Sequence, residues 1–138
     1  MIKEIVKDEK FLSQTSEKFV FGEDDHLIQD LLDTAEHYGE KCAGLACIQI
    51  GVPKRVIVAQ VIDKMVPFIN PIIIQKSKQT YITQEGCLSL DGLRTTKRHR
   101  KIKVGYLTKD GKSQCKEFSG FTAQVLQHEI DHLNGILI

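Results

Sequence analysis

The stretch His128-Glu129-Ile130-Asp131-His132 lies in a segment whose apolar spacing predicts a helix from about residue 121 to residue 133. Two histidines four residues apart share one helical face, so their imidazoles can bind the same ion. Glu129 can reach a water molecule at that ion. This is the H-E-x-x-H arrangement, which joins two metal ligands to a carboxylate base. The same short pattern occurs in unrelated proteins, so by itself it leaves open a surface histidine pair with no metal.

A catalytic metal site usually has three protein ligands and one open position. None of the residues that follow His132 is of a ligand type, so the third ligand must come from upstream. Cys87 is the best candidate, because it lies in the segment Glu85-Gly86-Cys87-Leu88-Ser89, where glycine permits a close approach of the backbone. The alternative is a cysteine that packs as a small apolar side chain.

The rest of the chain predicts one further helix and several strands. Helical spacing of apolar residues predicts a helix over 25–38, and an apolar run predicts a buried strand over 55–62. We expect Pro67 and Pro71 to interrupt the chain before a strand that begins at residue 72. Asp-Gly between two alternating runs predicts a hairpin over 101–118. This order predicts an α+β fold, with mainly antiparallel sheets packed around the C-terminal helix and an N-terminal helix.

The composition excludes several classes of protein. The chain has 138 residues, of which 41% are hydrophobic and 27% are charged, so we expect a single domain over residues 1–138. A formal net charge of +1 gives no overall attraction to nucleic acid or membrane. No apolar run is long enough for a membrane span, and the charged first ten residues do not fit a signal peptide. We therefore expect a cytoplasmic protein with four free thiols.

Three segments together resemble a known family. Residues 85–89, Glu-Gly-Cys-Leu-Ser, and residues 127–133, Gln-His-Glu-Ile-Asp-His-Leu, are similar to the second and third motifs of the peptide deformylases, and both are intact. Residues 42–49 are similar to the first motif, G-x-G-x-A-A-x-Q, except that Cys42 and Cys47 replace a glycine and an alanine. We interpret both cysteines as small-residue replacements. Strain at Cys42, and a bond between Cys47 and Cys87 on oxidation, are the alternatives.

The resemblance implies an activity and a set of ligands. The chain would remove the N-formyl group from N-formylmethionyl peptides of nascent proteins and release formate. Cys87, His128 and His132 would bind one divalent metal ion, commonly Fe(II) in this family, which Zn(II) or Ni(II) can replace. Glu129 would be the general base and then the acid. Another metal-dependent amidase or peptidase, and a non-catalytic metal-binding relative, are the two alternatives to this function.

The resemblance also implies residues that contact the substrate. Gln49 and the backbone N–H of Leu88 would donate hydrogen bonds to the formyl oxygen. Gly44 would let the substrate backbone pair alongside, and Arg94 would lie near the substrate. Helical spacing adds three residues one or two turns before His128 as a lining for the methionine side chain: Phe121, Gln124 and Val125.

A basic run covers residues 94–103. We expect it to be a solvated edge strand that its charges protect from aggregation. The alternatives are a transient contact with the ribosome, because the family acts on nascent chains, and a contact with an acidic peptide. The sequence predicts neither the oligomeric state nor a membrane partner.

Overall fold

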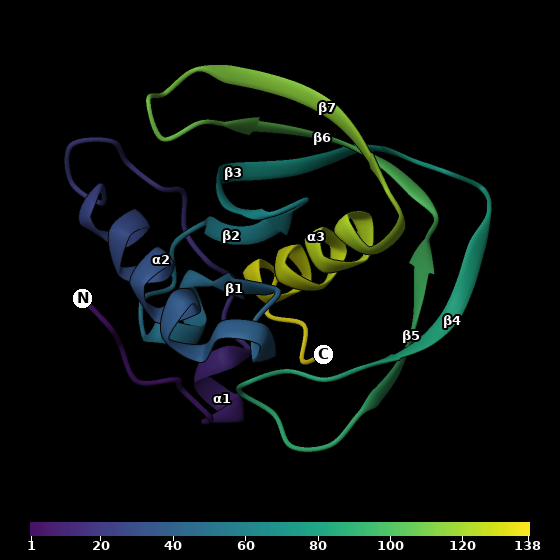
Figure 1. The fold of residues 1–138 in the computed structure, drawn as a ribbon. Helices are drawn as coiled ribbons and strands as arrows, with labels where there is room; N and C mark the ends of the chain where they lie inside the picture. The colour runs from purple at the N-terminus through teal and green to yellow at the C-terminus, as the bar shows by residue number, and fades with distance from the viewer.

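The computed structural model describes residues 1–138 and shows two antiparallel sheets around one helix, α3 (Gly120–Leu133) (Figure 1). The larger sheet has the strand order β1-β2-β3-β6-β7, and the smaller sheet pairs β4 with β5. The strands are β1 (Gly44–Ala46), β2 (Val56–Val61), β3 (Lys64–Lys76), β4 (Thr80–Glu85), β5 (Arg94–His99), β6 (Lys101–Leu107) and β7 (Ser113–Ser119). The remaining elements are helices α1 (Glu9–Leu12) and α2 (His26–Tyr38) and the 3₁₀ helices η1 (Gly39–Lys41) and η2 (Cys47–Ile50).

These elements confirm the predicted α+β fold. Helix α2 and helix α3 begin within a residue or two of the predicted positions, and β6 and β7 form the predicted hairpin. The short helix α1 was not predicted. None of the helices has both the length and the apolar character that a membrane crossing requires. All four cysteines are free thiols, as predicted.

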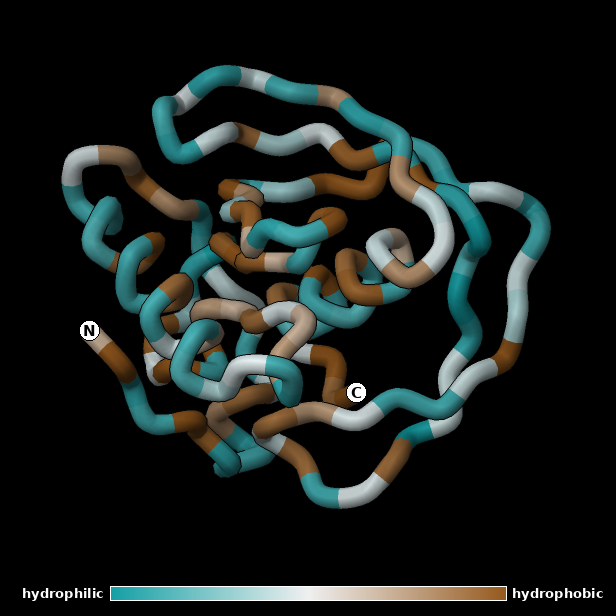
Figure 2. Tube along the Cα trace, in the orientation of Figure 1, coloured by the Kyte–Doolittle hydropathy of each residue, from teal (hydrophilic) through white to brown (hydrophobic).

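Strand β2 is buried on both faces, which explains its continuous apolar run. Ile57 and Ala59 pack into the cluster that contains α3, whereas Val56 and Val58 pack into the cluster that contains α2. All four side chains are fully buried. Apolar residues gather in this interior, and the outer strand β7 is mostly hydrophilic (Figure 2). The two helices are therefore fixed on opposite sides of the same strand.

The predicted interruption at Pro67 and Pro71 was wrong, because β3 continues through both prolines. β2 pairs with the first half of β3, and β6 pairs with the second half. Ile69 is the one residue of β3 that pairs with both neighbours. Each proline therefore lies where β3 has an unpaired edge, which is where a strand tolerates a residue without an N–H donor. Pro71 also falls within the register shift between Ile69 and Ile72, where Asn70 has φ 49°.

One side chain of α3 joins this helix to the smaller sheet. The Gln127 side-chain oxygen accepts a hydrogen bond from the His99 backbone N–H, and its amide nitrogen donates to the His99 carbonyl oxygen, both at 2.9 Å. Gln127 thus pairs with the end of β5 as a neighbouring strand would. Since His128 follows directly, this pairing fixes the first imidazole relative to both sheets.

Candidate metal centre and active site

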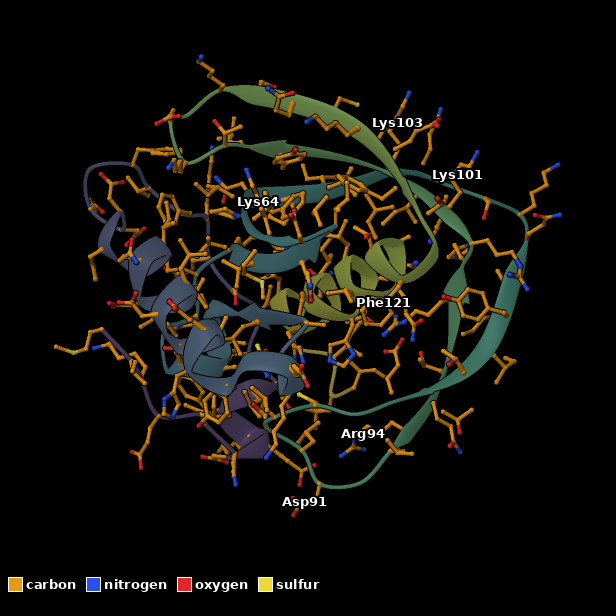
Figure 3. The ribbon with its side chains drawn as sticks, in the orientation of Figure 1. Lys64, Asp91, Arg94, Lys101, Lys103 and Phe121 are labelled. Atoms are coloured by element: carbon orange, nitrogen blue, oxygen red, sulfur yellow. The ribbon has the colours of Figure 1, made fainter.

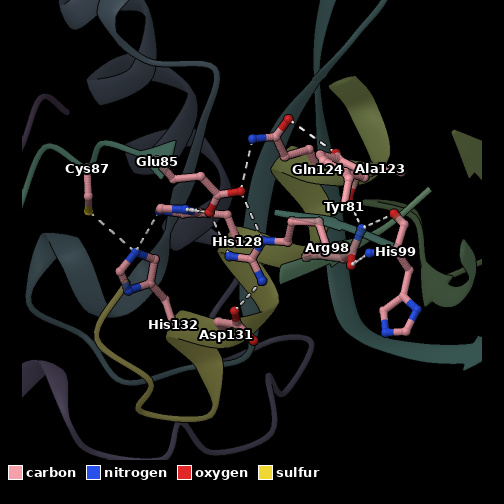
Figure 4. A network of polar contacts seen from close by, with 11 residues as sticks. Tyr81, Glu85, Cys87, Arg98, His99, Ala123, Gln124, His128, Asp131 and His132 are labelled. Carbon is pink, nitrogen blue, oxygen red and sulfur yellow. Dashed lines mark hydrogen bonds and ion pairs between the residues drawn. The ribbon is translucent and has the colours of Figure 1, made fainter. Parts of the chain in front are cut away.

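Three donor atoms from two distant segments meet beside α3. His128 and His132 project from successive turns of α3, and their Nε2 atoms are 3.2 Å apart. The Sγ atom of Cys87, which follows β4, lies 3.4 Å from Nε2 of His132 (Figure 4). All three donor atoms lie within 4.8 Å of one another. The structure thus brings together the three residues that the sequence predicted as ligands.

These separations fit one divalent ion. A tetrahedral site has metal–nitrogen bonds of about 2.0–2.1 Å and a metal–sulfur bond of about 2.3 Å. With these bond lengths, two nitrogen ligands lie about 3.4 Å apart, and a nitrogen lies about 3.6 Å from the sulfur. The observed separations are 3.2 and 3.4 Å. A thiolate with two imidazoles suits zinc or ferrous iron. The donor set therefore fits a transition-metal ion that needs no further protein ligand.

A buried ion network holds the first imidazole in place. Nδ1 of His128 lies 2.8 Å from Oε1 of Glu85, so the Nδ1–H donates to the carboxylate and Nε2 is left free to bind a metal. Arg98 donates to both oxygens of Glu85, at 2.9 and 2.7 Å, and to Asp131 at 2.6 Å. Although burial opposes the shift, Arg98 and His128 lower the pKa of Glu85 to about 2.

Sequence reasoning missed this network. The prediction of one solvated edge strand over 94–103 was wrong in two respects. The run is divided between β5 and β6, and β6 lies between β3 and β7 inside the larger sheet. In addition, the Arg98 side chain is only 5% exposed. β5 is indeed a strand, but Arg98 points from it toward α3, where Glu85 and Asp131 neutralise its charge. The sequence around Arg98 carries no signal for this network, although its partners Glu85 and Asp131 lie inside the second and third motifs.

Glu129 is a buried carboxylate with an unused acceptor. It is 5% exposed, and its Oε1 atom has no hydrogen-bond partner within the chain. Burial raises the pKa of Glu129 to about 7. A buried acceptor without a partner costs free energy, so its retention here indicates a role toward a bound molecule. Glu129 lines the same cavity as Cys87 and His128.

The cavity has a volume of about 500 Å³ and collects most of the predicted substrate residues. The predicted residues that line it are Gly44, Gln49, Leu88, Phe121, Gln124 and Val125. Lys41, Ala43 and Gln84, which were not predicted, also line it. Arg94 is outside this lining and lies 3.9 Å from Glu9 at the surface (Figure 3). A role for Arg94 near the substrate stays a prediction.

Two lining residues have little freedom. The Gln49 amide nitrogen donates to Sγ of Cys87 at 3.3 Å and to the Ser89 hydroxyl at 3.1 Å, so it faces the metal centre. At Gly44, a Cβ atom would lie 2.7 Å from a methyl carbon of Val125 and 2.9 Å from Oε2 of Glu129. Any larger side chain at Gly44 would displace the carboxylate.

The two replaced positions of the first motif keep ordinary geometry. Cys42 has φ −127°, so it is not in the left-handed region and carries none of the strain considered above. Cys47 is fully buried in the cluster with α2, whereas Cys87 lines the cavity and packs against the cluster of α3. This separation favours the interpretation of Cys47 as a small-residue replacement over a bond to Cys87.

Comparison with known proteins identifies the family. A family model described as polypeptide deformylase matches residues 2–138. The chain belongs to the peptide deformylase family. Peptide deformylases are metal-dependent hydrolases that remove the N-formyl group from nascent peptides, and the chain is an enzyme of this kind. This finding decides against the other amidases and the non-catalytic relative considered above.

Relatives match the chain over nearly its whole length. A peptide deformylase of Clostridium beijerinckii is 49% identical over 138 residues, which cover 100% of both chains. One of Pelagibacter ubique is 41% identical over 96% of this chain and 81% of its own. The class I type b peptide deformylase of Acinetobacter baumannii, solved with Met-Ala-Ser bound, has a TM-score of 0.90 and 29% identity, covering 99% and 97% of the two chains. The Thermotoga maritima enzyme has a TM-score of 0.89 and 33% identity, covering 99% and 95%.

Proposed function

We propose that the chain hydrolyses the formyl amide of N-formylmethionyl peptides in the cavity beside Cys87, His128 and His132, with Glu129 as the group that transfers the proton. One observation carries this proposal: a buried, partner-free carboxylate oxygen lies in the same cavity as the donor set. We propose Fe(II) as the ion in the cell, with Zn(II) or Ni(II) as replacements, because the mixed sulfur and nitrogen donors suit all three.

Glu129 would carry the proton through the reaction. When bound, the divalent ion lowers the pKa of a water molecule and polarises the formyl carbonyl. Glu129 accepts a proton as the water oxygen bonds to the formyl carbon. As the carbon–nitrogen bond breaks, Glu129 returns the proton to the leaving amine, and formate is released. Burial suits this role because it brings the pKa of Glu129 to about 7, close to neutral pH.

Gln49 and Leu88 would stabilise the negative charge that develops on the formyl oxygen. The Gln49 amide nitrogen already faces Cys87, and its side-chain oxygen accepts a hydrogen bond from the Ala46 N–H at 3.0 Å. That second bond fixes which end of the amide points toward the site. One donor of this kind is typically worth about 3–4 kcal/mol of the reaction barrier.

The peptide would lie along β1. This strand pairs only with β2, so its other edge is open, and Gly44 brings that edge to the cavity. An extended peptide can add to such an edge through backbone hydrogen bonds. Phe121, Gln124 and Val125 would surround the methionine side chain. The amide of Gln124 is occupied by Tyr81 and Glu85, so mainly its methylene groups remain for an apolar ligand.

Two substitutions test these roles. Glu129→Ala should keep the metal and abolish turnover, and retained turnover would remove Glu129 from the mechanism. Cys87→Ala should lose the metal, and unchanged metal content would contradict the ligand assignment. Metal is measured by elemental analysis of anaerobically purified protein, and turnover by formate release. An N-acetylated peptide is the matched substrate control, since equal hydrolysis of it would indicate a general amidase.

The basic run does not form one surface. Arg98 is buried, and the guanidinium of Arg100 lies 5.0 Å from the centre of the Tyr81 ring. Lys101 and Lys103 instead line a surface groove with Lys76, where Glu117 is the one acidic residue. Figure 3 labels Lys101 and Lys103, which lie at the start of β6 beside the end of β7.

We propose that Lys76, Lys101 and Lys103 make a transient contact with ribosomal RNA phosphates, which also implies a cytoplasmic location. Phosphate contacts weaken steeply as salt rises. Co-sedimentation with ribosomes should therefore decline between about 50 and 200 mM salt, and replacing all three lysines by glutamate should abolish it. Binding that is unchanged in the triple variant would contradict this contact.

A further inference from the structure

Lys41 places one unpaired positive charge on the wall of the active-site cavity. It is the last residue of η1, its side chain is exposed, and it forms no ion pair. The other charged residues of the cavity wall are Glu85 and His128, which pair with each other, and the buried Glu129. The remaining lining is apolar or neutral. Lys41 is therefore the charge that a bound peptide meets outside the reacting centre.

The position of Lys41 matches a particular part of the substrate. It precedes Gly44 by three residues, which corresponds to at most about 10 Å along an extended backbone. A peptide along β1 with its formyl group at Cys87 extends about 3.3 Å per residue. Its second or third residue therefore comes within reach of the long Lys41 side chain, whereas the methionine itself lies nearer Val125.

We infer that Lys41 is a specificity residue that favours formylated peptides with an acidic side chain at the second or third position. This inference rests on the proposed function. A carboxylate there gains an ion pair at a partly enclosed site, and a lysine there is repelled by a like charge. Exposed pairs of this kind change binding by about 1.7- to threefold. Attraction and repulsion together predict an acidic-to-basic preference of about three- to tenfold at low salt.

Three amidated peptides test this preference on the metal-loaded enzyme. They are formyl-Met-Asp-Asp, formyl-Met-Ser-Ser and formyl-Met-Lys-Lys, and the measured quantity is kcat/KM from formate release. We expect the aspartyl peptide to lead the lysyl peptide by about three- to tenfold, with the ratio falling toward one as salt screens the pair. Lys41→Glu should invert the ratio.

Lys64→Glu is the matched control. It makes the same change of charge at an exposed lysine on the first residue of β3, outside the cavity lining (Figure 3), and it should leave the ratio as in the wild type. An equal shift with Lys64→Glu, or no shift with Lys41→Glu, would overturn the inference. If formyl-Met-Ser-Ser is hydrolysed and the ratio is one, only the role of Lys41 fails. If no peptide is hydrolysed, the proposed function fails with it.

Discussion

Replacing Arg98 by methionine should destabilise both the fold and the metal centre. The Arg98 side chain is 5% exposed and makes three charge-assisted hydrogen bonds, two to Glu85 and one to Asp131. Glu85 is similarly buried, with 6% of its side chain exposed, so loss of the guanidinium leaves its charge with only the His128 imidazole and the Gln124 amide as partners. Removing one member of a buried pair costs about 3–5 kcal/mol. We therefore expect Arg98→Met to lower the free energy of unfolding by that amount.

The same change should reach the metal through His128. Its Nδ1–H donates to Glu85, and a partner of this kind usually affects metal affinity by about 10- to 100-fold. Urea unfolding of the metal-free protein isolates the stability term, and competition with a chromophoric chelator measures metal affinity. A shift in urea midpoint without a change in slope would show that stability alone has changed.

A double-mutant cycle separates the pair from its surroundings. Glu85→Gln removes the negative charge and keeps an acceptor for His128. Adding it to Arg98→Met removes both charges, so the double variant should be more stable than Arg98→Met alone. If Arg98→Met costs less than about 1 kcal/mol, or if the two losses simply add, the buried network does not hold the site as described.

Three further predictions concern other parts of the site. Gly44→Ala should lower the free energy of unfolding by about 1–3 kcal/mol, measured in thermal melts. It should also lower formate release about 100-fold, because the added methyl group displaces the Glu129 carboxylate. Wild-type turnover in this variant would contradict the crowding at Gly44. At pH 8, a disulfide reagent should label the exposed Cys115 rapidly. Cys42 and Cys47 should react only after unfolding, because burial raises the pKa of both thiols to about 12. Fast labelling of three or more thiols in the metal-loaded protein would disprove this difference in reactivity. Chelation should remove about 2.7 kcal/mol of stability if the metal was present at 100 times its Kd, and an unchanged melting temperature would show that the metal does not bind the folded chain preferentially.

The elements with strong local signals were predictable from the sequence. The Asp-Gly turn specified the hairpin of β6 and β7, and apolar spacing specified α2 and α3. The strand predicted from residue 72 is the second half of β3, but its continuation through Pro67 and Pro71 was not predictable. A proline excludes a strand only where its N–H would meet a partner. Whether an edge is paired depends on how β2 and β6 share β3, and that is a property of the assembled sheet.

The candidate site likewise contains residues that the sequence alone identified and one residue that it did not. Cys87, His128, His132 and Glu129 lie in two short motifs with fixed spacing, so the sequence alone singled them out as candidates. The structure brings the three donor atoms together, and their roles stay a prediction. Arg98 stands in a run of basic residues, and nothing local distinguishes it from its solvated neighbours. Its burial follows from the side of β5 that packs on α3, and its charge is tolerable only because Glu85 and Asp131 arrive from other elements.

The division of the donor set between Cys87 and the distant helix α3 has a consequence for when the enzyme can work. A chain that is still being translated holds only the thiol until codons for His128 and His132 have been read. If these three residues bind the metal as proposed, an ion captured earlier would have a single protein ligand. On the proposed ligand assignment, the complete donor set forms only once α3 has been synthesised and has packed beside Cys87.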